Sequence, residues 1–383
     1  MLFGPCAQNA VASFLPATSL LCSGGAGFIT AMMATLATNA RTAPAKTLDG
    51  GVPVVDTLAV RMVTDNIVIQ FVPSEKRDGL TIERRSGNTK PDVPPRHILN
   101  GEWGLSMHAQ SFAGEERNLL IDFGYTPEVL NNNMAILGIE PSCFDAIVLS
   151  HGHYDHFGGM VGFLKAHGSA LKKKMPFYVG GEDCFCLRRN PGGNFGALDR
   201  KAILDADLTL MMASEPAIVA DHAFTTGRIG QTSFEQPLQP STEIIGIFDG
   251  FGCFPEKMPP HKNTGSYIPD DFEHEIGTTY TVKEKGLVVL TSCSHRGVIN
   301  TVRQAKEASG IDKVHAVIGG FHVVPPLGDD YINKTIDEFR GIDPDYLITA
   351  HCTGDRFYDL ARAALGDKVI HSAVGTRFVF GKA

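Results

Sequence analysis

Residues 150–159 read Ser-His-Gly-His-Tyr-Asp-His-Phe-Gly-Gly. They follow the apolar run Phe144 to Ser150, which has the composition of a buried strand. Three imidazoles and one carboxylate therefore stand together at a strand end: His151, His153, Asp155 and His156. Neutral imidazole and carboxylate are ligands that suit Zn²⁺, Mn²⁺ and Fe, so this stretch predicts a metal site.

The spacing of these residues predicts two metal ions. In an extended or turning segment, residues two apart project to one side, so His151 and His153 can share an ion. Asp155 and His156 begin the next turn and can hold a second ion, and Asp155 is also the predicted catalytic group. A histidine-rich surface loop is the alternative, but the preceding strand and the two following glycines argue against it. We expect two divalent ions, with Zn²⁺ favoured and Mn²⁺ or Fe as alternatives.

The last third of the chain alternates between strand and helix patterns. Strands are predicted at 286–291, 314–318 and 346–349, and helices at 298–308, 330–339 and 357–365. This alternation predicts a sheet with helices on its outer face. A histidine follows each of the three strands, at His295, His322 and His351, so we expect all three to reach one edge of the sheet.

The earlier regions are less uniform. Apolar, β-branched runs at 52–60 and 66–72 predict two strands, and the proline-rich segment 73–101 predicts an irregular loop. A further strand at 118–124 contains Asp122, and a helix is predicted at 127–137. Residues 180–275 are rich in glycine and proline and predict an insertion that covers or frames an active site.

The pattern His-x-His-x-Asp-His followed by Gly-Gly resembles the signature of the metallo-β-lactamase superfamily. The likeness extends over most of residues 100–383, and five further stretches resemble one branch: 104–106, 120–124, 292–297, 319–322 and 351–354. That branch is typified by an archaeal dihydropterin ribofuranosyl-aminobenzene phosphate synthase of methanopterin biosynthesis. The resemblance implies an α/β fold, a four-layer αββα sandwich with the metals at one edge, here with an inserted cap region.

The chain departs from the superfamily pattern at two places. Arg228 stands in the turn where members often place a further histidine ligand, and Ser292-Cys293-Ser294-His295 stands where many place a bridging aspartate. We therefore expect His295 to fill one of these two vacancies as a metal ligand, and the resemblance implies His351 at the second metal. A hydrogen-bonding role at a strand end is the alternative for both histidines.

Five other residues are expected near the metals. Asp122 is predicted to orient a ligand imidazole, with a strand-end turn role as the alternative. His322 and Arg296 are predicted to contact the substrate or to support a ligand from outside. Cys293 and Cys352 flank candidate ligands and are either thiolate ligands or, as we favour, small packed residues.

The eight cysteines do not indicate a disulfide scaffold in a chain of 383 residues, and no CxxC pair occurs. Free, buried or site-lining thiols are the expected state, and the sequence assigns no role to Cys184 and Cys186.

The net charge of −8 and the lack of long basic runs disfavour nucleic-acid binding, because phosphate contacts need clustered Lys and Arg. No membrane association is expected either. The predicted partner is a small molecule that can carry a phosphate.

Residues 1–45 differ in composition from the rest of the chain. They contain no Lys, Asp or Glu, and their apolar part resembles the core of an export signal without the usual preceding positive charge. We interpret them as a leader or a disordered tail, and 46–383 as the catalytic domain with an insertion at about 180–275. A cytoplasmic location is slightly favoured over export.

The leading functional hypothesis is a metal-dependent hydrolase or transferase. A two-metal site would activate water and polarise a phosphoryl or carbonyl group of a small molecule. The alternatives are a pterin-pathway synthase like the archaeal enzyme, and a non-catalytic metal-binding sensor of the same fold.

Overall fold

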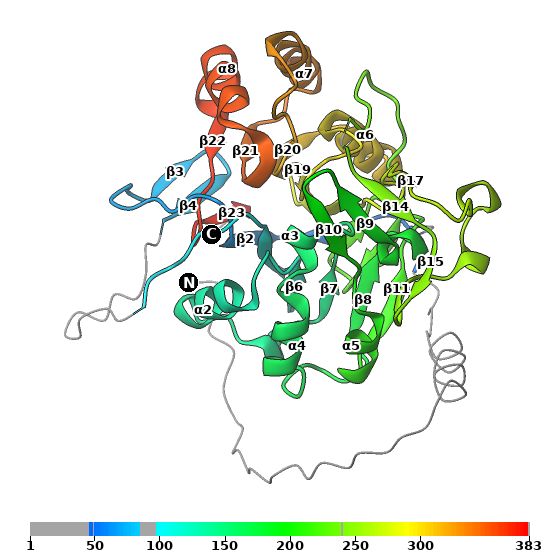
Figure 1. Cartoon of the computed structure of the whole chain (residues 1–383). Helices are drawn as coiled ribbons and strands as arrows, with labels where there is room; N and C mark the ends of the chain where they lie inside the picture. Colours follow the sequence, from blue (N-terminus) through cyan, green and yellow to red (C-terminus); the bar gives the residue numbers. More distant parts are fainter. Residues whose placement is uncertain (1–45, 49, 85–96, 239, 382–383) are drawn as a thin grey trace.

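The computed structural model describes residues 46–48, 50–84, 97–238 and 240–381, and Figure 1 draws the remainder as a thin grey trace. The predicted leader at 1–45 and the part of the proline-rich segment at 85–96 lie outside the described residues.

One main sheet contains nine strands in the described part of the chain. In spatial order they are β11 (Thr209–Met212), β8 (Pro176–Val179), β7 (Ala146–Val148), β6 (Glu116–Ile121), β5 (Ser106–Phe112), β2 (Thr57–Thr64), β23 (Arg377–Gly381), β4 (Leu80–Glu83) and β3 (Glu75–Arg77). Strands β6, β7, β8 and β11 are parallel, so their carboxyl ends meet at one edge. The histidine-rich stretch begins at that edge, two residues beyond β7.

The second main sheet contains eight strands among the described residues. Its order is β12 (Ala217–Val219), β13 (Ala223–Thr225), β18 (Thr278–Val282), β19 (Gly286–Thr291), β20 (Val314–Gly319), β21 (Tyr346–Thr349) and β22 (Val369–His371), with β1 (Val54–Val55) paired to β18. Strands β19 to β22 are parallel. The segments that follow β19, β20 and β21 therefore leave from the same edge.

The two sheets face each other across a core to which both contribute buried side chains, such as Met107 and Ile121 from one sheet and Val288 and Ile318 from the other. Alternation along β6 turns Leu120 to the opposite face, where it meets helices.

Three helices cover the outer face of the first sheet: α2 (Pro127–Leu137), α4 (Met160–His167) and α5 (Arg200–Asp205). Three others cover the second sheet: α6 (Val298–Ser309), α7 (Asp329–Ile342) and α8 (Asp355–Leu365). The short helix α3 (Tyr154–Phe157) lies at the edge where the histidines gather (Figure 1). The predicted four-layer αββα sandwich is thus confirmed.

The helix predicted at 127–137 is confirmed, and local chemistry explains its ends. The Thr126 hydroxyl accepts a hydrogen bond from the Val129 amide, Pro127 occupies the first turn, and Gly138 closes the helix with φ of 67°. The strands predicted at 286–291 and 346–349 are confirmed with the same bounds.

Two predictions for the early region are wrong. Residues 66–72 form no strand, because the run lies at the surface without a neighbouring strand, with Phe71 fully exposed. The segment 73–101 is not wholly irregular, since β3 and β4 form a hairpin within it. Strand propensity alone therefore predicted the wrong residues for the edge strands of this sheet.

Residues 180–275 only partly stand outside the sandwich. A small sheet, β10 (Gly193–Gly196), β9 (Leu187–Asn190), β14 (Thr242–Ile244) and β17 (Ile268–Pro269), and the hairpin β15 (Gly246–Phe248) and β16 (Phe251–Cys253) are additions to it. Between these additions, α5, β11, β12 and β13 belong to the main layers. We call the sheet β10–β9–β14–β17 the cap sheet.

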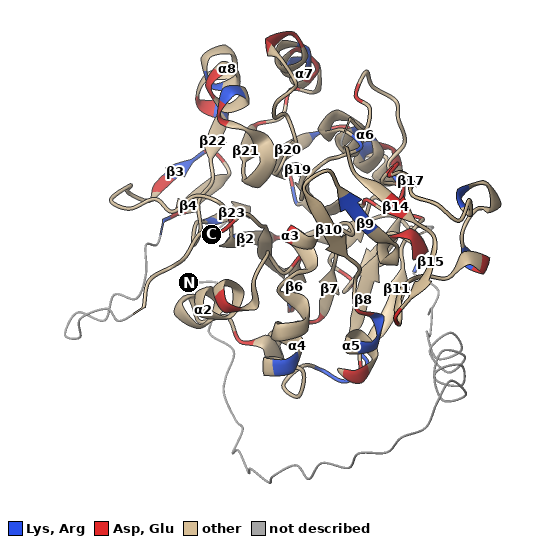
Figure 2. Cartoon of the chain, viewed as in Figure 1, with Lys and Arg blue, Asp and Glu red and all other residues tan. Residues whose placement is uncertain are grey.

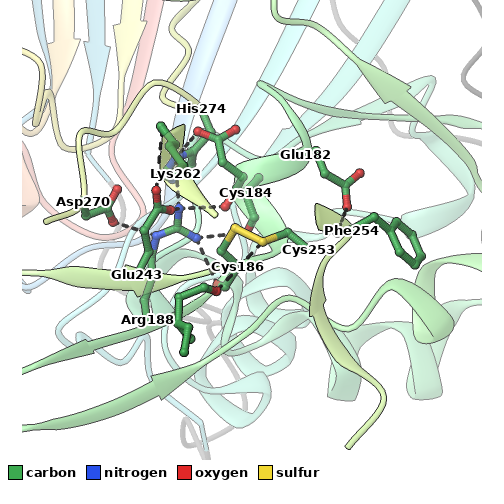
Figure 3. Close-up of a disulfide and its surroundings, with 12 residues drawn as sticks. Glu182, Cys184, Cys186, Arg188, Glu243, Cys253, Phe254, Lys262, Asp270 and His274 are labelled. Carbon is green, nitrogen blue, oxygen red and sulfur yellow. Dashed lines mark hydrogen bonds and ion pairs between the residues drawn. A yellow bond between two sulfur atoms is a disulfide. The ribbon is translucent and has the colours of Figure 1, made fainter. Parts of the chain in front are cut away.

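The expectation of free thiols is wrong for Cys186 and Cys253, which form a disulfide with a Cα–Cα distance of 4.5 Å (Figure 3). It joins the residue before β9 to the end of β16. Cys143 is disulfide-bonded as well. Cys184, Cys293 and Cys352 are free and buried, as expected.

Charges of both signs are interleaved along the outer helices, as Figure 2 shows for α7 and α8, which are also joined by the ion pair of Arg356 with Asp329. Within the described residues, no helix combines the length and the apolar character that a membrane span requires.

We predict that replacing both cysteines, Cys186→Ser with Cys253→Ser, lowers the free energy of unfolding by about 2–4 kcal/mol, because the bond closes a long loop in the unfolded chain. Denaturant unfolding without reductant measures the change. Cys184→Ser, at a buried free thiol nearby, is the control and should lower the free energy of unfolding by less. An unchanged midpoint in the double variant would contradict a stabilising role.

Candidate metal centre

Three buried imidazoles from distant parts of the chain converge as a first group. His151 and His153 follow β7, and His295 follows β19. One ligand atom from each lies within 4.8 Å of the others, and the two Nε2 atoms of His151 and His295 are 3.1 Å apart. Nitrogens that share a tetrahedral zinc lie about 3.3 Å apart, so this spacing suits one ion.

A second group lies beside the first and contains Asp155, His156, Cys293 and His351, with ligand atoms again within 4.8 Å of one another. The Cys293 thiol is 3.1 Å from His156 Nε2. The Asp155 carboxylate is 3.3 Å from His351 Nε2 and 3.6 Å from His156 Nε2. This set offers one carboxylate, one thiol and two imidazoles to a second ion.

Asp122 fixes the orientation of two of these imidazoles. Its carboxylate accepts hydrogen bonds from His156 Nδ1 and from the Ser150 hydroxyl, each at 2.8 Å. Ser150 Oγ is in turn 2.9 Å from His151 Nδ1. Because the serine hydrogen is donated to Asp122, Ser150 accepts from His151, and both imidazoles keep the Nε2 lone pair for the groups described above.

His351 is held in a similar way by Asp65 and Asn66, which follow β2. Asn66 Oδ1 lies 3.2 Å from His351 Nδ1, and the Asn66 amide donates to the His351 carbonyl at 2.7 Å. Asp65 accepts a hydrogen bond from the His351 backbone amide at 2.9 Å. Sequence reasoning missed this pair, because nothing around Asp65 resembles a motif.

The backbone is strained where the site is built. Asp122, Ser294, His322 and His351 have φ values of 58°, 65°, 49° and 48°, in the left-handed region that non-glycine residues seldom adopt. Each such residue costs of order 1–3 kcal/mol and persists where surrounding structure holds it. No other residue fits at Gly319, three positions before His322, because an added Cβ would lie 1.7 Å from the Thr291 carbonyl oxygen.

Burial keeps the first group neutral. It lowers the pKa of His151 and His295 well below the ordinary value, and that of His153 to about 3. For Asp155, burial alone would raise the pKa, but the electrostatic interaction with His156 and the close approach of His351 hold it well below its usual range. Neutral imidazoles and an ionised carboxylate are the protonation states in which these groups bind metals.

A cavity of about 300 Å³ opens onto both groups. Its floor contains His153, Asp155, Cys293, His295, His322 and Cys352, and its walls contain Trp103, Tyr125, Tyr154, Asn190 and Phe195. Trp103, Tyr125 and Tyr154 are among the exposed large apolar side chains of the described chain. The site is thus a pocket with a polar floor and mainly aromatic walls.

The other predicted residues fall at different distances from this floor. His322 lies against His295, with ring centroids 4.5 Å apart, but belongs to neither ligand group. Burial lowers the pKa of His322 to about 4. Arg296 does not line the cavity; its guanidinium donates to the carbonyls of Ile229 and Asp271. Cys293, favoured above as a packed residue, faces a ligand group instead.

The nitrogen atoms of the two ligand groups are not fully satisfied by hydrogen bonds to one another, so their arrangement suits metal ions better. His351 Nε2 is buried without a hydrogen bond, although buried polar atoms are usually paired. His151 and His295 turn Nε2 atoms toward each other, and the proton on His151 is already on its other nitrogen. Ions bound by these nitrogens would satisfy the lone pairs that hydrogen bonds leave unused.

Comparison with known proteins agrees with this geometry. The model of the metallo-beta-lactamase superfamily matches residues 109–173. The 7,8-dihydropterin-6-methyl-4-(beta-D-ribofuranosyl)-aminobenzene-5'-phosphate synthase of Methanocaldococcus jannaschii is 30% identical over 264 residues, 65% of this chain and 82% of the relative. A UPF0173 metal-dependent hydrolase of Staphylococcus aureus is 39% identical over 70 residues, 18% of this chain and 29% of the relative.

Among solved structures, a metal-dependent hydrolase of the beta-lactamase superfamily shares the fold. It has a TM-score of 0.59 and 19% identity, and the match covers 84% of this chain and 98% of that one. Sequence, fold and the arrangement of the histidines agree, and the chain belongs to the metallo-β-lactamase superfamily.

Proposed function

We propose that this protein is an enzyme that binds two divalent metal ions, hydrolysing a small molecule or transferring part of it. The observation that carries the proposal is the pair of neighbouring ligand groups, each of which contributes residues to the lining of one cavity: His151, His153 and His295 beside Asp155, His156, Cys293 and His351. Imidazole, carboxylate and thiolate together favour Zn²⁺, with Mn²⁺ or Fe as alternatives.

Two ions at such a site lower the pKa of water and polarise a carbonyl or phosphoryl oxygen. Asp155 lines the cavity and is held ionised, so it can orient the nucleophilic water and accept its proton. His322 also lines the cavity and is neutral near pH 7, so it can exchange a hydrogen bond with the substrate.

A second candidate is a synthase like the relative from Methanocaldococcus jannaschii, whose name contains a pterin and an aminobenzene ring. The aromatic walls favour it, because Trp103, Tyr125, Tyr154 and Phe195 offer faces and edges on which a flat ring can stack. The Trp103 and His351 ring centroids are 5.2 Å apart, so Trp103 lies beside the second ligand group.

Metal analysis tests the two-metal proposal. We predict about two transition-metal ions per chain, and the loss of about one ion in each of His295→Ala and His351→Ala. His322→Ala should keep both ions but lose activity, because His322 belongs to neither ligand group. His261→Ala, at an exposed histidine, is the control.

Elemental analysis after loading with Zn²⁺, Mn²⁺ or Fe²⁺ gives the stoichiometry. Wild-type protein that takes up none of these ions would refute the proposal. Loss of an ion in His322→Ala with both retained in His351→Ala would reverse the two roles.

Asp155→Asn should abolish nearly all turnover on a verified substrate while leaving the circular dichroism spectrum unchanged, because the amide cannot accept the proton and binds metal more weakly. Wild-type turnover in this variant would remove Asp155 from the mechanism. A sensor without catalytic activity would instead bind metal normally and show no turnover on any compound in a panel of phosphodiesters, lactones and thioesters.

Trp103→Ala should raise KM about tenfold for substrates that carry an aromatic ring and change it little for aliphatic analogues, since one stacking partner is lost. Phe251→Ala, at an exposed aromatic residue that does not line the cavity, is the matched control. Equal effects of Trp103→Ala on aromatic and aliphatic substrates would argue against a ring bound at these walls.

A further inference from the structure

His153 is linked to a buried charge in the cap sheet region. Its Nε2 atom is 3.3 Å from the Ser241 hydroxyl, which is 3.4 Å from the Asp270 carboxylate. The same carboxylate oxygen accepts a hydrogen bond of 2.7 Å from Arg188 Nε. All four side chains are buried, so the chain of contacts lies away from solvent.

The chemistry of these groups fixes the direction of the hydrogen bonds. An Asp270 carboxylate paired with Arg188 can only accept, so Ser241 donates its single hydrogen to it. The serine oxygen is then the acceptor for His153 Nε2. His153 therefore carries its proton on Nε2 and has Nδ1 as the lone pair for a metal.

Arg188 is anchored independently of this chain of contacts. Besides Asp270, it pairs with Glu243 at 2.9 Å, its partner in the register of β9 and β14. It also donates to the carbonyls of Cys184 and Cys186, beside the disulfide (Figure 3). The guanidinium is therefore a fixed point from which Asp270 is positioned.

Arg188 also packs closely against the metal-binding stretch itself. A Cβ atom at Gly152, between His151 and His153, would lie 2.6 Å from Arg188 Nη1 and from the Cys184 carbonyl. Asp270 further accepts the Phe272 amide at 3.0 Å, and the Phe272 ring stacks on His295 with centroids 4.2 Å apart.

The same arrangement of histidine, serine and aspartate occurs on the other side of the first group. His151 contacts Ser150, and Ser150 donates to Asp122. There the serine and aspartate lie in the main sandwich, whereas Ser241 and Asp270 stand opposite each other at one end of the cap sheet pairing between β14 and β17. Each of the two neighbouring imidazoles, His151 and His153, thus contacts a serine that donates to an aspartate. One serine–aspartate pair belongs to the main sandwich and the other adjoins the cap sheet.

We propose that Ser241 and Asp270, held by Arg188, are positioning residues that fix the ring and the tautomer of His153 for metal binding. This inference rests on the proposed metal centre. It assigns to the cap sheet region a role in building the first metal site, in addition to its contribution to the cavity wall.

Ser241→Ala tests the proposal most directly, because it cuts the link and leaves the Arg188–Asp270 pair in place. We expect the affinity of the first site to fall roughly 10–100-fold in competition with a chelator, as for other supports of metal ligands. The visible spectrum of the Co²⁺-loaded protein should change as well, since His153 can then rotate or present its other nitrogen. Ser241→Thr retains the hydroxyl and should restore both properties.

Ser111→Ala is the matched control, since it removes another buried serine hydroxyl that contacts a histidine, His222 Nδ1 at 2.9 Å, outside both ligand groups. Both Ser111→Ala and Ser241→Ala can lower the denaturation midpoint, but only Ser241→Ala should weaken metal binding. Two ions held with wild-type affinity and spectrum in Ser241→Ala would overturn the inference while the metal centre stands. Failure of the wild-type protein to bind Co²⁺ would instead refute the metal centre itself.

Discussion

The carboxylate of Asp122 is the contact on which the centre depends. It is fully buried, stands directly after β6, and accepts hydrogen bonds from the Ser150 amide, the Ser150 hydroxyl and His156 Nδ1. A buried carboxylate is tolerated only when such bonds satisfy it. The same three bonds fix the start of the histidine-rich stretch and reach one imidazole from each ligand group, His156 directly and His151 through Ser150. The two groups therefore share one support.

The sandwich brings the remaining ligands to this support by topology. The parallel strands of each sheet end at one edge, and the edges of the two sheets lie side by side. His295 and His351 therefore contact a stretch that lies more than 100 residues earlier in the chain. The left-handed backbone of His322 and His351 shows that the strand ends are bent sharply to present these rings. The core between the sheets, which is apolar and continuous, holds the edges in place against that strain.

The sequence was informative where a signal is local. Neighbouring positions in the sequence stay close in the fold, so the spacing predicted that His151, His153, Asp155 and His156 lie together. The strand patterns before His295 and His351 likewise predicted that both rings reach the same edge. The sequence did not show in the same way which side chain at a strand end joins a ligand group. Cys293 enters a ligand group and His322 does not, because the path of the backbone beyond each strand decides which side chain reaches the group, and no propensity predicts that path. The disulfide of Cys186 and Cys253 was missed for a related reason, since pairing depends on a close approach of residues 67 apart.

The sequence of residues 180–275 did not predict their role, because strand pairing brings the important side chains together and no motif along the chain marks them. Arg188, Ser241 and Asp270 form no pattern along the chain, and they become neighbours only through the register of β9 with β14 and of β14 with β17. The strand β9 that carries Arg188 also carries Asn190, which lines the cavity wall, and the adjoining β10 carries Phe195. A shift in the register of β9 would therefore move part of the cavity lining and the contact of Ser241 with His153 together. Under the proposed function, the cap sheet couples the shape of the pocket to the geometry of the first metal, so a change of substrate at this wall is constrained by the need to keep Arg188 in place.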